Sequence, residues 1–599
     1  MPPKQNQKSD YWFFLALVSL VIFLLPFFAT VSYSESDSRY SLLVSQSILE
    51  NRTIQLDAYH QAGAIQDQDY RLHKKNGHLY YYFPLGTSLL SLPIVGAARL
   101  VGMDMAVPAH EDALQNLLSA ILCSVTFLFL FGMIHHFLDW STSLSVASIF
   151  ILGSSLISSL GTTLWSSHFA ATLVVVVLYL LTRSENEPSR QIPGVLVGCL
   201  LFVAYLSRPT LIILTLLIMA LLFLQWRAAF WKAITAYMLL LLLFIAFNWQ
   251  EYGQILPDYY TLSRLNQSNQ LWIPLYGHLL SPSRGLLIFS PFLTLTLIGG
   301  YLAFPSLKQR PLFWLVVLWF SLHLMAVSRF NHWWGGWSFG SRLMIEVIPG
   351  LALLTAMVWQ TLSKTTAPSI RRVGGAGFIF LGCVAIYINS WQGLYNLNTA
   401  QWNMLPDSGK NPGYWATLPY IDEYPAYLFD WRYPQFMASA KSLQERYLEF
   451  GLAQLHQGAI ELNSYSIGQT IDYTNSEMFA LFAGWSTAEP EFRWSKSRQA
   501  IIVFFIENDK ASEPNLFLDI HAFGLGPQTI LVSLNDHEIG ELTYHEAPQI
   551  QTIKFVSQLL QPGINQLRFD IPGAKKPNTQ DRRLLGLALI EIQIRESPN

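Results

Sequence analysis

Apolar segments long enough to cross a lipid bilayer recur through the first 390 residues of this 599-residue chain. They lie at 11–30, 113–134, 142–160, 166–182, 192–207, 210–225, 233–249, 285–303, 311–328, 343–362 and 374–390. Only 13% of the residues are charged, whereas a typical soluble chain carries about 25% charged residues. The sequence therefore predicts a polytopic α-helical membrane protein with about eleven transmembrane helices.

The topology depends on one ambiguous segment, 83–102, which contains Pro84, Pro93 and Arg99 and either spans the bilayer or lies flat at its interface. If it lies flat, the inward segments hold eleven Lys and Arg residues and the outward loops hold five; counting it as a span reverses this bias. The positive-inside rule therefore favours a flat segment. The N-terminus is then cytoplasmic, and the chain after Asn389 is outside. The first segment is interpreted as an uncleaved helix because no small-residue cleavage site follows it.

The chain changes character after the last apolar segment. Charged residues return, and hydrophobic patterns of period two appear at 500–506, 515–523, 529–545, 565–571 and 587–594. Asn535-Asp536 separates two such runs and indicates a hairpin turn. These strands predict an extracytoplasmic all-β sandwich of jelly-roll type. The expected organisation is a tail and first helix (1–31), an outer loop with interfacial helices (32–112), a helix bundle (113–390), a helical or irregular connector (391–460) and the β-sandwich (461–599).

Several functional classes receive no support from the sequence. The net charge of −2 does not favour nucleic-acid binding, and the three cysteines lie inside apolar runs, which argues against a disulfide framework or a zinc pattern. No catalytic-triad order, phosphate loop or dinucleotide fingerprint stands out, and no cofactor is required. A divalent metal held by Asp37 with His60, His73 or His78 stays open as an alternative.

Polar residues that are unusual for a membrane protein fall mostly in the predicted outward loops. They include Glu35, Asp37, Arg39, Asp57, Lys74, Lys75, His168, Arg208, Asp258, Arg264, Arg284, His332 and Arg342. An arginine at the outer end of a span commonly anchors the helix by snorkelling. As a set, these cations also fit a cradle for a lipid phosphate, because guanidinium groups bind phosphate oxygens bidentately. The stretches "SRPT" and "SPSRGLLIFSP" place Arg208 and Arg284 at helix ends, where such a headgroup would lie.

Two other features have both a structural and a functional interpretation. His168 in "WSSHFA" is either a hydrogen-bonding residue at a helix end or a substrate contact. The tryptophans of "NHWWGGWSFGSR", Trp334 among them, either form an interfacial aromatic belt or stack on sugars and prenyl chains.

The acids Glu35 and Asp37 follow the first apolar segment in "YSESDSRYS". A carboxylate at this place is either a solvated loop charge or a general base. In attack on an anomeric carbon, a carboxylate takes the proton from the acceptor hydroxyl as phosphate leaves. Side chains two residues apart diverge in a helix, so only one of the two acids is expected to face a site.

The order of these features resembles the GT-C glycosyltransferase superfamily. More closely, it is similar to bacterial relatives of protein O-mannosyltransferases and of the lipid A aminoarabinose transferase. The resemblance covers roughly residues 11–400 and is carried by the first-loop acid with "RY", "SLLVSQSILENRTIQLDAY", "YYYFPLGTSLLSLP", "LWSSH", "LSRPT", "SPSRGLLIFSPFL" and "WWGGWSFGSRLMIEVIPGL". It implies an inverting transferase that uses a polyprenyl-phosphate-linked sugar on the outer face. It also implies that Asp37 is the base and that Arg208 and Arg284 hold the donor phosphate.

Two departures from the family pattern affect the residue assignments. Relatives usually show adjacent Asp-Glu, one further residue, then a basic residue and Tyr; counted back from Tyr40, the first acid falls on Ser36 and the second on Asp37. Either Asp37 or Glu35 then serves as the base. The relatives' lysine before the proline of the flat segment is replaced by Phe83, and Lys74 or Lys75 is the candidate substitute. Arg342 completes the phosphate candidates, and the substrate-binding candidates are Arg39, Tyr40, His168, Asp258 and Trp334.

The leading hypothesis is a multi-pass enzyme of the cytoplasmic membrane. It would move a sugar from a polyprenyl-phosphate donor to a hydroxyl of an envelope glycan, glycolipid or protein. "FAGWSTAEPEFRWS" and "RRLLGLALIEIQI" resemble β-rich, sugar-associated modules of bacterial envelope proteins, so the β-domain is expected to position the acceptor or cap the site. The alternatives are a transporter or flippase of lipid-linked glycans and a non-catalytic envelope scaffold. A transporter would need polar residues at mid-membrane depth, whereas here they collect at one face.

Overall fold

The computed structural model describes residues 5–65, 69–186, 191–261, 265, 270–403, 421, 425–456, 462–472, 479–486, 489–507, 513–577 and 584–597. The chain divides into two compact units. The helical unit comprises Met1–Asn403 with Ile421–Met437, and the β unit comprises Met404–Tyr420 with Ala438–Asn599. Much of the predicted connector, at 404–420, 422–424 and 457–460, lies outside the described residues.

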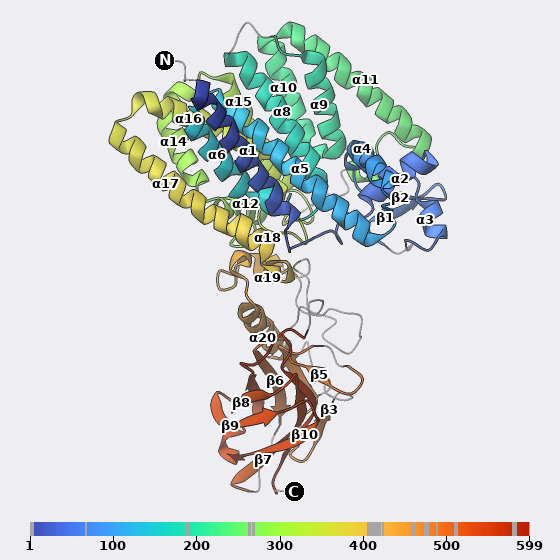
Figure 1. Ribbon diagram of the computed structural model, residues 1–599, viewed down its shortest axis with the longest axis vertical. Helices are drawn as coiled ribbons and strands as arrows, with labels where there is room; N and C mark the ends of the chain where they lie inside the picture. Colours follow the sequence, from blue (N-terminus) through green and yellow to red (C-terminus); the bar gives the residue numbers. More distant parts are fainter. Residues whose placement is uncertain are drawn as a thin grey trace. The chain divides into compact units, whose positions relative to one another are not determined.

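The helical unit is drawn from blue to yellow in Figure 1. Its helices are α1 (Gln5–Phe27), α2 (Ser41–Asn51), α3 (Asp57–Gln61), α4 (Gly86–Leu100), α5 (Pro108–His135), α6 (Trp140–Leu152), α7 (Ser155–Ser158), α8 (Ser166–Asn186), α9 (Gly194–Ser207), α10 (Ile212–Gln225), α11 (Arg227–Tyr252), α12 (Trp272–Leu280), α13 (Leu286–Phe289), α14 (Leu293–Leu307), α15 (Pro311–Val327), α16 (Ile348–Thr365), α17 (Pro368–Ile386), α18 (Gly393–Tyr395) and α19 (Leu397–Gln401). Tighter or wider turns form η1 (Pro209–Leu211), η2 (Asp258–Tyr260), η4 (Arg342–Val347), η5 (Tyr387–Gln392), η6 (Pro425–Phe429) and η7 (Gln435–Met437).

Each of the predicted transmembrane segments is helical, which confirms a mostly helical protein with several apolar helices. Two segments are broken. The segment 142–160 is interrupted between α6 and α7, where the Ser154 hydroxyl accepts a hydrogen bond from the backbone N–H of Leu156, and 285–303 is interrupted at Ser290-Pro291 between α13 and α14. Among the described residues, five helices are both long and apolar enough to cross a membrane, and seven shorter apolar helices accompany them. The count of eleven crossings stays a prediction.

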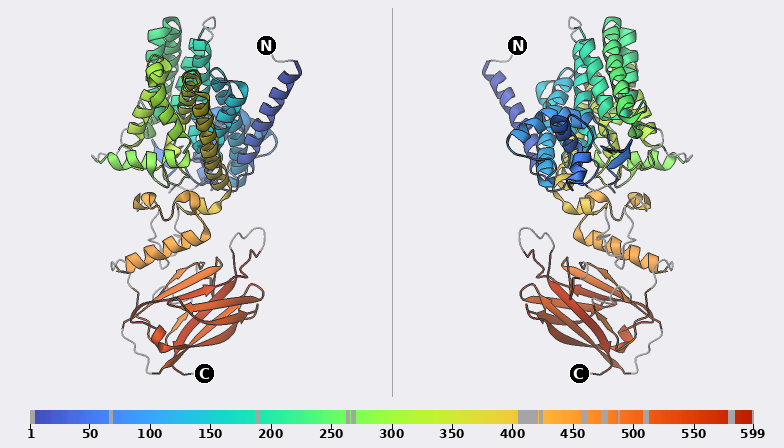
Figure 2. Two further views of the ribbon diagram at one scale, coloured as in Figure 1. Left: turned by 90° about the vertical axis from the view of Figure 1, so that its left-hand side faces the viewer. Right: turned by 90° about the vertical axis from the view of Figure 1, so that its right-hand side faces the viewer.

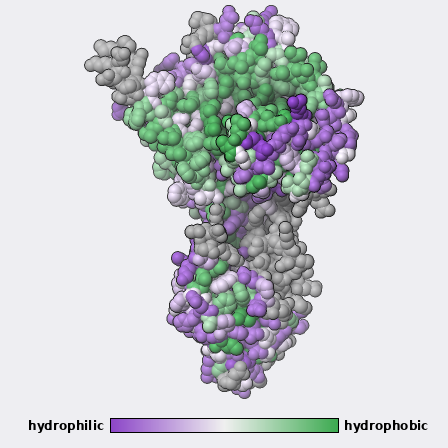
Figure 3. All heavy atoms as spheres, turned by 45° about the vertical axis from the view of Figure 1, so that its right-hand side comes forward, coloured by the Kyte–Doolittle hydropathy of each residue, from purple (hydrophilic) through white to green (hydrophobic). Residues whose placement is uncertain are grey.

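Burial separates the central helices from the peripheral ones. The apolar window within Arg342–Thr365, which contains η4 and α16, is 89% buried, whereas the windows within Arg227–Tyr252 and Pro368–Tyr395 are 17% and 33% buried. Figure 1 shows α11 and α17 on opposite sides of the unit. Figure 3 shows a broad hydrophobic surface on the helical unit, and an apolar surface of this extent would be unfavourable in water. The helical unit therefore belongs to a multi-pass membrane protein.

Residues 32–65 and 69–112 form a cap at one end of the helices (Figure 1). The cap contains α2, α3, α4 and a hairpin of β1 (Leu72–Lys75) and β2 (His78–Tyr81). The hairpin is closed by Asn76 and Gly77, both with positive φ, which is the backbone that an Asn-Gly turn favours. This turn was detectable in the sequence but was not among the predicted elements. The flat segment 83–102 contains α4, which packs against α2, α8 and α9; its orientation to a membrane stays a prediction.

The β unit contains α20 (Ala440–His456), β3 (Thr470–Asp472), β4 (Ala480–Ala483), β5 (Arg493–Trp494), β6 (Gln499–Ile506), β7 (Asn515–Gly524), β8 (Gln528–Leu534), β9 (His537–Tyr544), β10 (Gln549–Val556), η8 (Ser557–Leu559), β11 (Gly563–Asp570) and β12 (Leu587–Arg595). Two five-stranded sheets run β10-β7-β12-β3, with β5 beside β12, and β4-β6-β11-β8-β9. Every pairing among the described strands is antiparallel.

The two sheets bury one shared apolar core, as expected of a sandwich (Figure 2). Leu518 and Ile520 of one sheet and Ile502 and Phe504 of the other belong to this core. The predicted strands at 500–506, 515–523, 529–545, 565–571 and 587–594 are all present. The turn at Asn535-Asp536 is confirmed, with positive φ at both residues. β10 and the short strands β3, β4 and β5 were not predicted, because their runs are brief or weakly alternating.

Candidate active site

The loop of residues 32–40, here called the acid loop, is fixed to the bundle by hydrogen bonds from its own backbone and side chains. The backbone N–H of Tyr33 donates to the Thr162 carbonyl oxygen at 3.1 Å. The hydroxyls of Ser38 and Thr163 lie 2.7 Å apart, and the Gln115 amide oxygen accepts from the Thr163 hydroxyl at 2.7 Å. The two acids of the loop are therefore held against the turn between α7 and α8.

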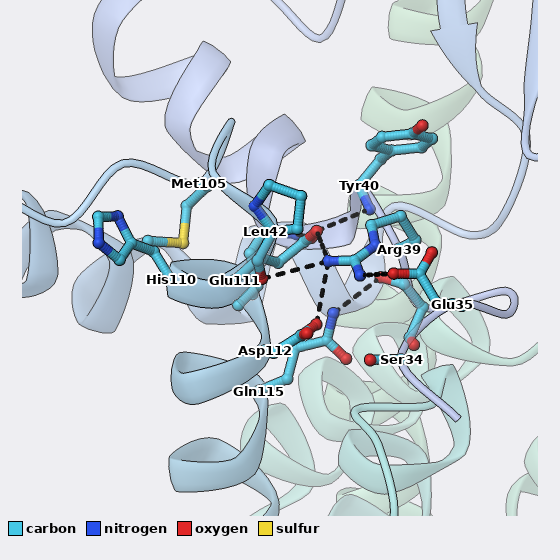
Figure 4. Close-up of polar contacts among 12 residues, drawn as sticks. Ser34, Glu35, Arg39, Tyr40, Leu42, Met105, His110, Glu111, Asp112 and Gln115 are labelled. Atoms are coloured by element: carbon cyan, nitrogen blue, oxygen red, sulfur yellow. Dashed lines mark hydrogen bonds and ion pairs between the residues drawn. The ribbon is translucent and has the colours of Figure 1, made fainter. Parts of the chain in front are cut away.

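Arg39 gathers three carboxylates around one guanidinium, as Figure 4 shows. It pairs directly with Glu35, and its Nη1 lies 3.0 Å from Asp112 and 3.3 Å from Glu111. The Arg39 side chain is only 5% exposed, whereas that of Glu35 is 74% exposed. These carboxylates compensate the burial of the Arg39 guanidinium, and its predicted contact with substrate stays a prediction.

Glu111 is a site-forming residue that the sequence analysis missed. It is almost fully buried, and its two oxygens accept the backbone N–H groups of Tyr40 at 3.3 Å and Leu42 at 3.2 Å. These donors belong to the first turn of α2, where unpaired N–H groups favour a carboxylate. Tyr40 has a φ of 72°, and this positive value turns the chain from the acid loop into α2. An acid at the start of an apolar helix was the signal available in the sequence.

A second guanidinium, that of Arg71, approaches the same loop. It donates to Asp69 at 2.7 and 2.6 Å and to the Glu35 backbone carbonyl at 2.8 Å. Although burial opposes it, hydrogen bonding from Arg71 lowers the pKa of Asp69. Burial and the Asp69 charge, to which the Tyr40 hydroxyl donates at 3.0 Å, raise the pKa of Tyr40 to about 12. Tyr40 is thus bonded within the cap, and its predicted contact with substrate stays a prediction.

Asp37 lies apart from the carboxylates around Arg39. One of its oxygens is 2.7 Å from Nη2 of Arg342, and its side chain is 32% exposed. The Arg342 guanidinium stacks 3.4 Å from the centre of the Trp165 ring and donates to the Gly335 carbonyl at 2.8 Å. The Tyr81 hydroxyl donates to the backbone carbonyl of Asp37. Both acids thus have a buried arginine as a partner. The partner of Glu35, Arg39, is four residues away in the sequence, whereas the partner of Asp37, Arg342, comes from a distant part of the chain.

Arg208 completes this group from a third part of the chain. Its Nε donates to Oε1 of Glu346 at 2.6 Å, and Nη1 lies 3.5 Å from the Tyr259 hydroxyl. Burial lowers the pKa of Arg208, but Glu346 outweighs it and, with a smaller contribution from Asp37, holds that pKa above its usual value. Burial and then the Asp37 charge likewise raise the pKa of Tyr81. We call Asp37, Arg342, Arg208 and Glu346 the Asp37 cluster.

Arg284 occupies a different environment from the other two arginines. It is 1% exposed, and it donates to the Trp334 carbonyl at 2.9 Å, to Oδ1 of Asn403 at 2.6 Å, and to the amide oxygen of Gln435. It therefore ties together three loops of the helical unit. Its proposed contact with a phosphate stays a prediction that would require these bonds to open.

The other candidates fall at the edges of this region. Lys75 pairs with Asp258 at 3.1 Å, and Lys74 is exposed on β1. His168 is fully buried; Nε2–H donates to the Leu160 carbonyl oxygen, and Nδ1 lies 3.3 Å from the Trp165 carbonyl oxygen. The Nε2–H bond fits the helix-end interpretation, and a contact of His168 with substrate stays a prediction. Trp334 is nearly buried and packs edge to face on Trp333.

A small pocket adjoins the Asp37 cluster. It is lined largely by aromatic residues, including His73, Tyr81, Tyr82, Phe83, Tyr252 and Tyr259. Tyr81 and Tyr259 connect it to the cluster, because Tyr81 contacts Asp37 and Tyr259 contacts Arg208. Lys75 and Asp258 lie near His73 but are paired with each other. The pocket therefore combines ring faces with phenolic hydroxyls, a surface that suits a polyhydroxylated ring or an apolar chain.

Within the part of the chain that the structure describes, no group of three or more His, Cys, Asp or Glu side chains could hold a metal ion. His78, one of the proposed partners of Asp37, instead lies 2.9 Å from Asp57.

No family model matches this chain, and no curated protein matches it. Solved structures do. ArnT from Cupriavidus metallidurans, in the apo state, matches 75% of this chain and 72% of its own, with 12% identity and a TM-score of 0.41. An Archaeoglobus fulgidus oligosaccharyltransferase tethered with an acceptor peptide matches 71% of this chain and 59% of its own, with 13% identity and a TM-score of 0.43. A CBM35 from Paenibacillus barcinonensis matches 22% of this chain and 100% of its own, with 13% identity and a TM-score of 0.16.

ArnT and the oligosaccharyltransferase are both GT-C membrane glycosyltransferases, which is the superfamily that the sequence resembles. At these identities and TM-scores, the likeness carries no residue roles over to this chain.

Proposed function

We propose that this protein is an inverting glycosyltransferase that moves a sugar from a polyprenyl-phosphate donor to a hydroxyl of an envelope glycan, glycolipid or protein. The observation that carries the proposal is the Asp37 cluster. A partly exposed carboxylate, Asp37, pairs with Arg342, and its charge also acts on the buried Arg208. This reaction needs a general base close to cationic groups that bind the leaving phosphate. A bundle of membrane helices can bind a lipid-linked donor.

In the proposed reaction, Asp37 takes the proton of the acceptor hydroxyl while the acceptor oxygen bonds to the anomeric carbon. The bond from that carbon to the phosphate oxygen breaks on the opposite face, and polyprenyl phosphate leaves with the electron pair. The charge on the leaving phosphate increases, so Arg208 and Arg342 stabilise the transition state more than the ground state. Because Arg342 also pairs with Asp37 at 2.7 Å, a bound phosphate would compete for Arg342 and release Asp37 to act as the base.

The choice of Asp37 over Glu35 rests on their partners. Glu35 is paired with Arg39 and lies 3.7 Å from Arg71, so it serves the structure of the acid loop. Asp37 lies between Arg342 and the aromatic pocket that Tyr81 lines. We propose that the aromatic faces and phenolic hydroxyls beside Asp37 contact the donor sugar. This requires the pocket to open, because its volume of about 10 Å³ holds only about one water.

The proposed location is the cytoplasmic membrane, with the acid loop and the β unit on its outer face. The positive-inside count supports this orientation. The proposed role of the β unit is acceptor binding.

The test uses purified protein in lipid nanodiscs with a panel of radiolabelled polyprenyl-phosphate sugars. Asp37→Asn is expected to lower transfer by about 100-fold or more, because general-base catalysis contributes about 10²–10⁴-fold. Glu35→Gln is the matched control and should retain most of the activity. Normal turnover by Asp37→Asn with an inactive Glu35→Gln would move the base to Glu35. Translocation of the donors across vesicles without any transfer would favour the flippase instead.

A further inference from the structure

Arg208 and Glu346 form an ion pair in the interior of the helical unit. Arg208 follows the last residue of α9, and Glu346 lies in the short helix η4 that leads into α16. The Glu346 side chain is 0% exposed and that of Arg208 is 9% exposed. Burying two charges is costly unless their geometry is good. The 2.6 Å contact from Nε of Arg208 to Oε1 of Glu346 meets that condition.

The remaining contacts of the pair are long. Nη1 of Arg208 lies 3.5 Å from the Ser166 hydroxyl and 3.5 Å from the Tyr259 hydroxyl, at the outer limit of a hydrogen bond. Oε2 of Glu346 lies 3.7 Å from Nε2 of His323. That nitrogen already donates to the Leu343 carbonyl at 2.9 Å. Glu346 therefore holds the Nε edge of the guanidinium firmly, while the Nη edge remains weakly held.

The same short helix also supplies Arg342. Arg342 is the first residue of η4 and pairs with Asp37, while Glu346, near its end, pairs with Arg208. η4 is buried along its whole length, so its backbone is a rigid support. One element thus supplies Arg342, which pairs with Asp37, and the carboxylate that holds Arg208.

We propose that Glu346 is a positioning residue: it orients Arg208 so that the Nη edge of the guanidinium faces the phosphate of the lipid donor. This inference rests on the proposed function, because it assigns the phosphate as the partner of Arg208. Glu346 itself does not touch the donor. Its effect on phosphate binding should therefore pass entirely through Arg208.

The experiment measures binding of undecaprenyl phosphate, the lipid that the neighbour ArnT binds in one solved structure, to full-length protein in nanodiscs. Glu346→Gln removes the charge that fixes Arg208 and should weaken binding about 10-fold, in line with one hydrogen bond between charged groups. Arg208→Ala should weaken it at least as much. The double variant should bind no more weakly than Arg208→Ala, because residues that act as a unit are not additive.

Two further variants separate positioning from folding. Glu346→Asp keeps the charge but shortens the side chain, so the protein should fold normally and still bind undecaprenyl phosphate more weakly than wild type. Thr355→Val is the matched control, since it removes a buried contact of α16, 2.9 Å from Thr296, without touching the cluster. It should bind like wild type.

Three outcomes would contradict either the positioning role of Glu346 or the proposed function. Wild-type affinity in both Glu346→Asp and folded Glu346→Gln, with weak binding by Arg208→Ala, would overturn the positioning role alone. Additive losses in the double variant would show that Glu346 acts independently of Arg208 and would also overturn it. Equal binding by wild type and Arg208→Ala would remove Arg208 from the phosphate site, which contradicts the proposed function itself.

Discussion

At the scale of single residues, hydrogen-bond and ion-pair partners distinguish side chains that look alike in the sequence. Arg208, Arg284 and Arg342 are all arginines near helix ends, yet Arg284 is bonded to loop carbonyls and amides, whereas the other two face carboxylates. Sequence spacing favoured Asp37 over Glu35; both acids are paired with arginines in the structure, and the choice between them as the base stays a prediction. Glu346 was not predicted because its partner lies 138 positions away, a distance that no local pattern spans.

A glycine of the cap provides a test at the residue scale. A Cβ on Gly86, the first residue of α4, would lie 2.6 Å from the backbone N and Cα of Ser207, which directly precedes Arg208. Backbone atoms cannot swing aside, so Gly86→Ala should destabilise the protein by about 1–3 kcal/mol. It should also weaken transfer by displacing Arg208. Thermal unfolding in detergent measures the first effect.

Gly96→Ala is the control on the same helix. There a Cβ would lie 3.7 Å from a Leu49 methyl group, an ordinary contact, and alanine favours a helix over glycine by about 1 kcal/mol. Unfolding temperatures that fall equally in both variants would show that the close approach to Ser207 is not what Gly86 provides.

At the scale of elements, the sequence predicted the helices well but could not rank them by how deeply each is buried inside the helical unit. Hydropathy is high in both α16 and α17, yet α16 is central and α17 is peripheral. A helix in lipid and a helix in a protein core carry the same kind of residues, because both environments are apolar. Breaks such as the one between α6 and α7 were also hidden, since both pieces are apolar. The β1–β2 hairpin was missed even though Asn76-Gly77 signalled its turn.

A pair of alanines tests the difference between these two helices. Ala356 in α16 is fully buried, whereas Ala376 in α17 is exposed. Ala356→Leu should overpack the core and destabilise the protein by about 1–3 kcal/mol. Ala376→Leu adds the same atoms toward lipid and should change stability by less than about 0.5 kcal/mol. Folded yield and unfolding temperature in detergent compare them, and equal losses would contradict the central place of α16.

At the scale of the whole molecule, the two units follow different rules of burial. The helical unit leaves large apolar side chains uncovered, such as Leu242 of α11 and Phe380 of α17, whereas the β unit has a shared core inside its own sheets. Composition alone predicted this change of class after residue 390. It did not predict where the second unit begins, because α20 reads as part of a connector. The structure groups the chain from Ala438 onward with the β-sandwich.

The start of the β unit can be tested by comparing two fragments, 438–599 and 461–599. α20 packs on β4, and Oε1 of Gln444 in α20 accepts from the Ser497 hydroxyl at 3.1 Å. Leu443 and Gln444 are buried. The longer fragment should therefore fold alone, with a β-type circular dichroism spectrum and one cooperative unfolding transition. The shorter fragment should keep the sheets but lose about 1–3 kcal/mol of stability, since it exposes the surface that α20 covers.

Trp485→Ala in the longer fragment is the control for cooperativity. Trp485 is 1% exposed and packs on Phe569 and Phe482 in the core of the sandwich. The substitution should cost about 3–5 kcal/mol, because it leaves a large cavity. Urea unfolding followed by tryptophan fluorescence and by circular dichroism measures all three proteins. Identical midpoints for 438–599 and 461–599 would return α20 to the connector, and the unit would then begin where the sequence alone placed it.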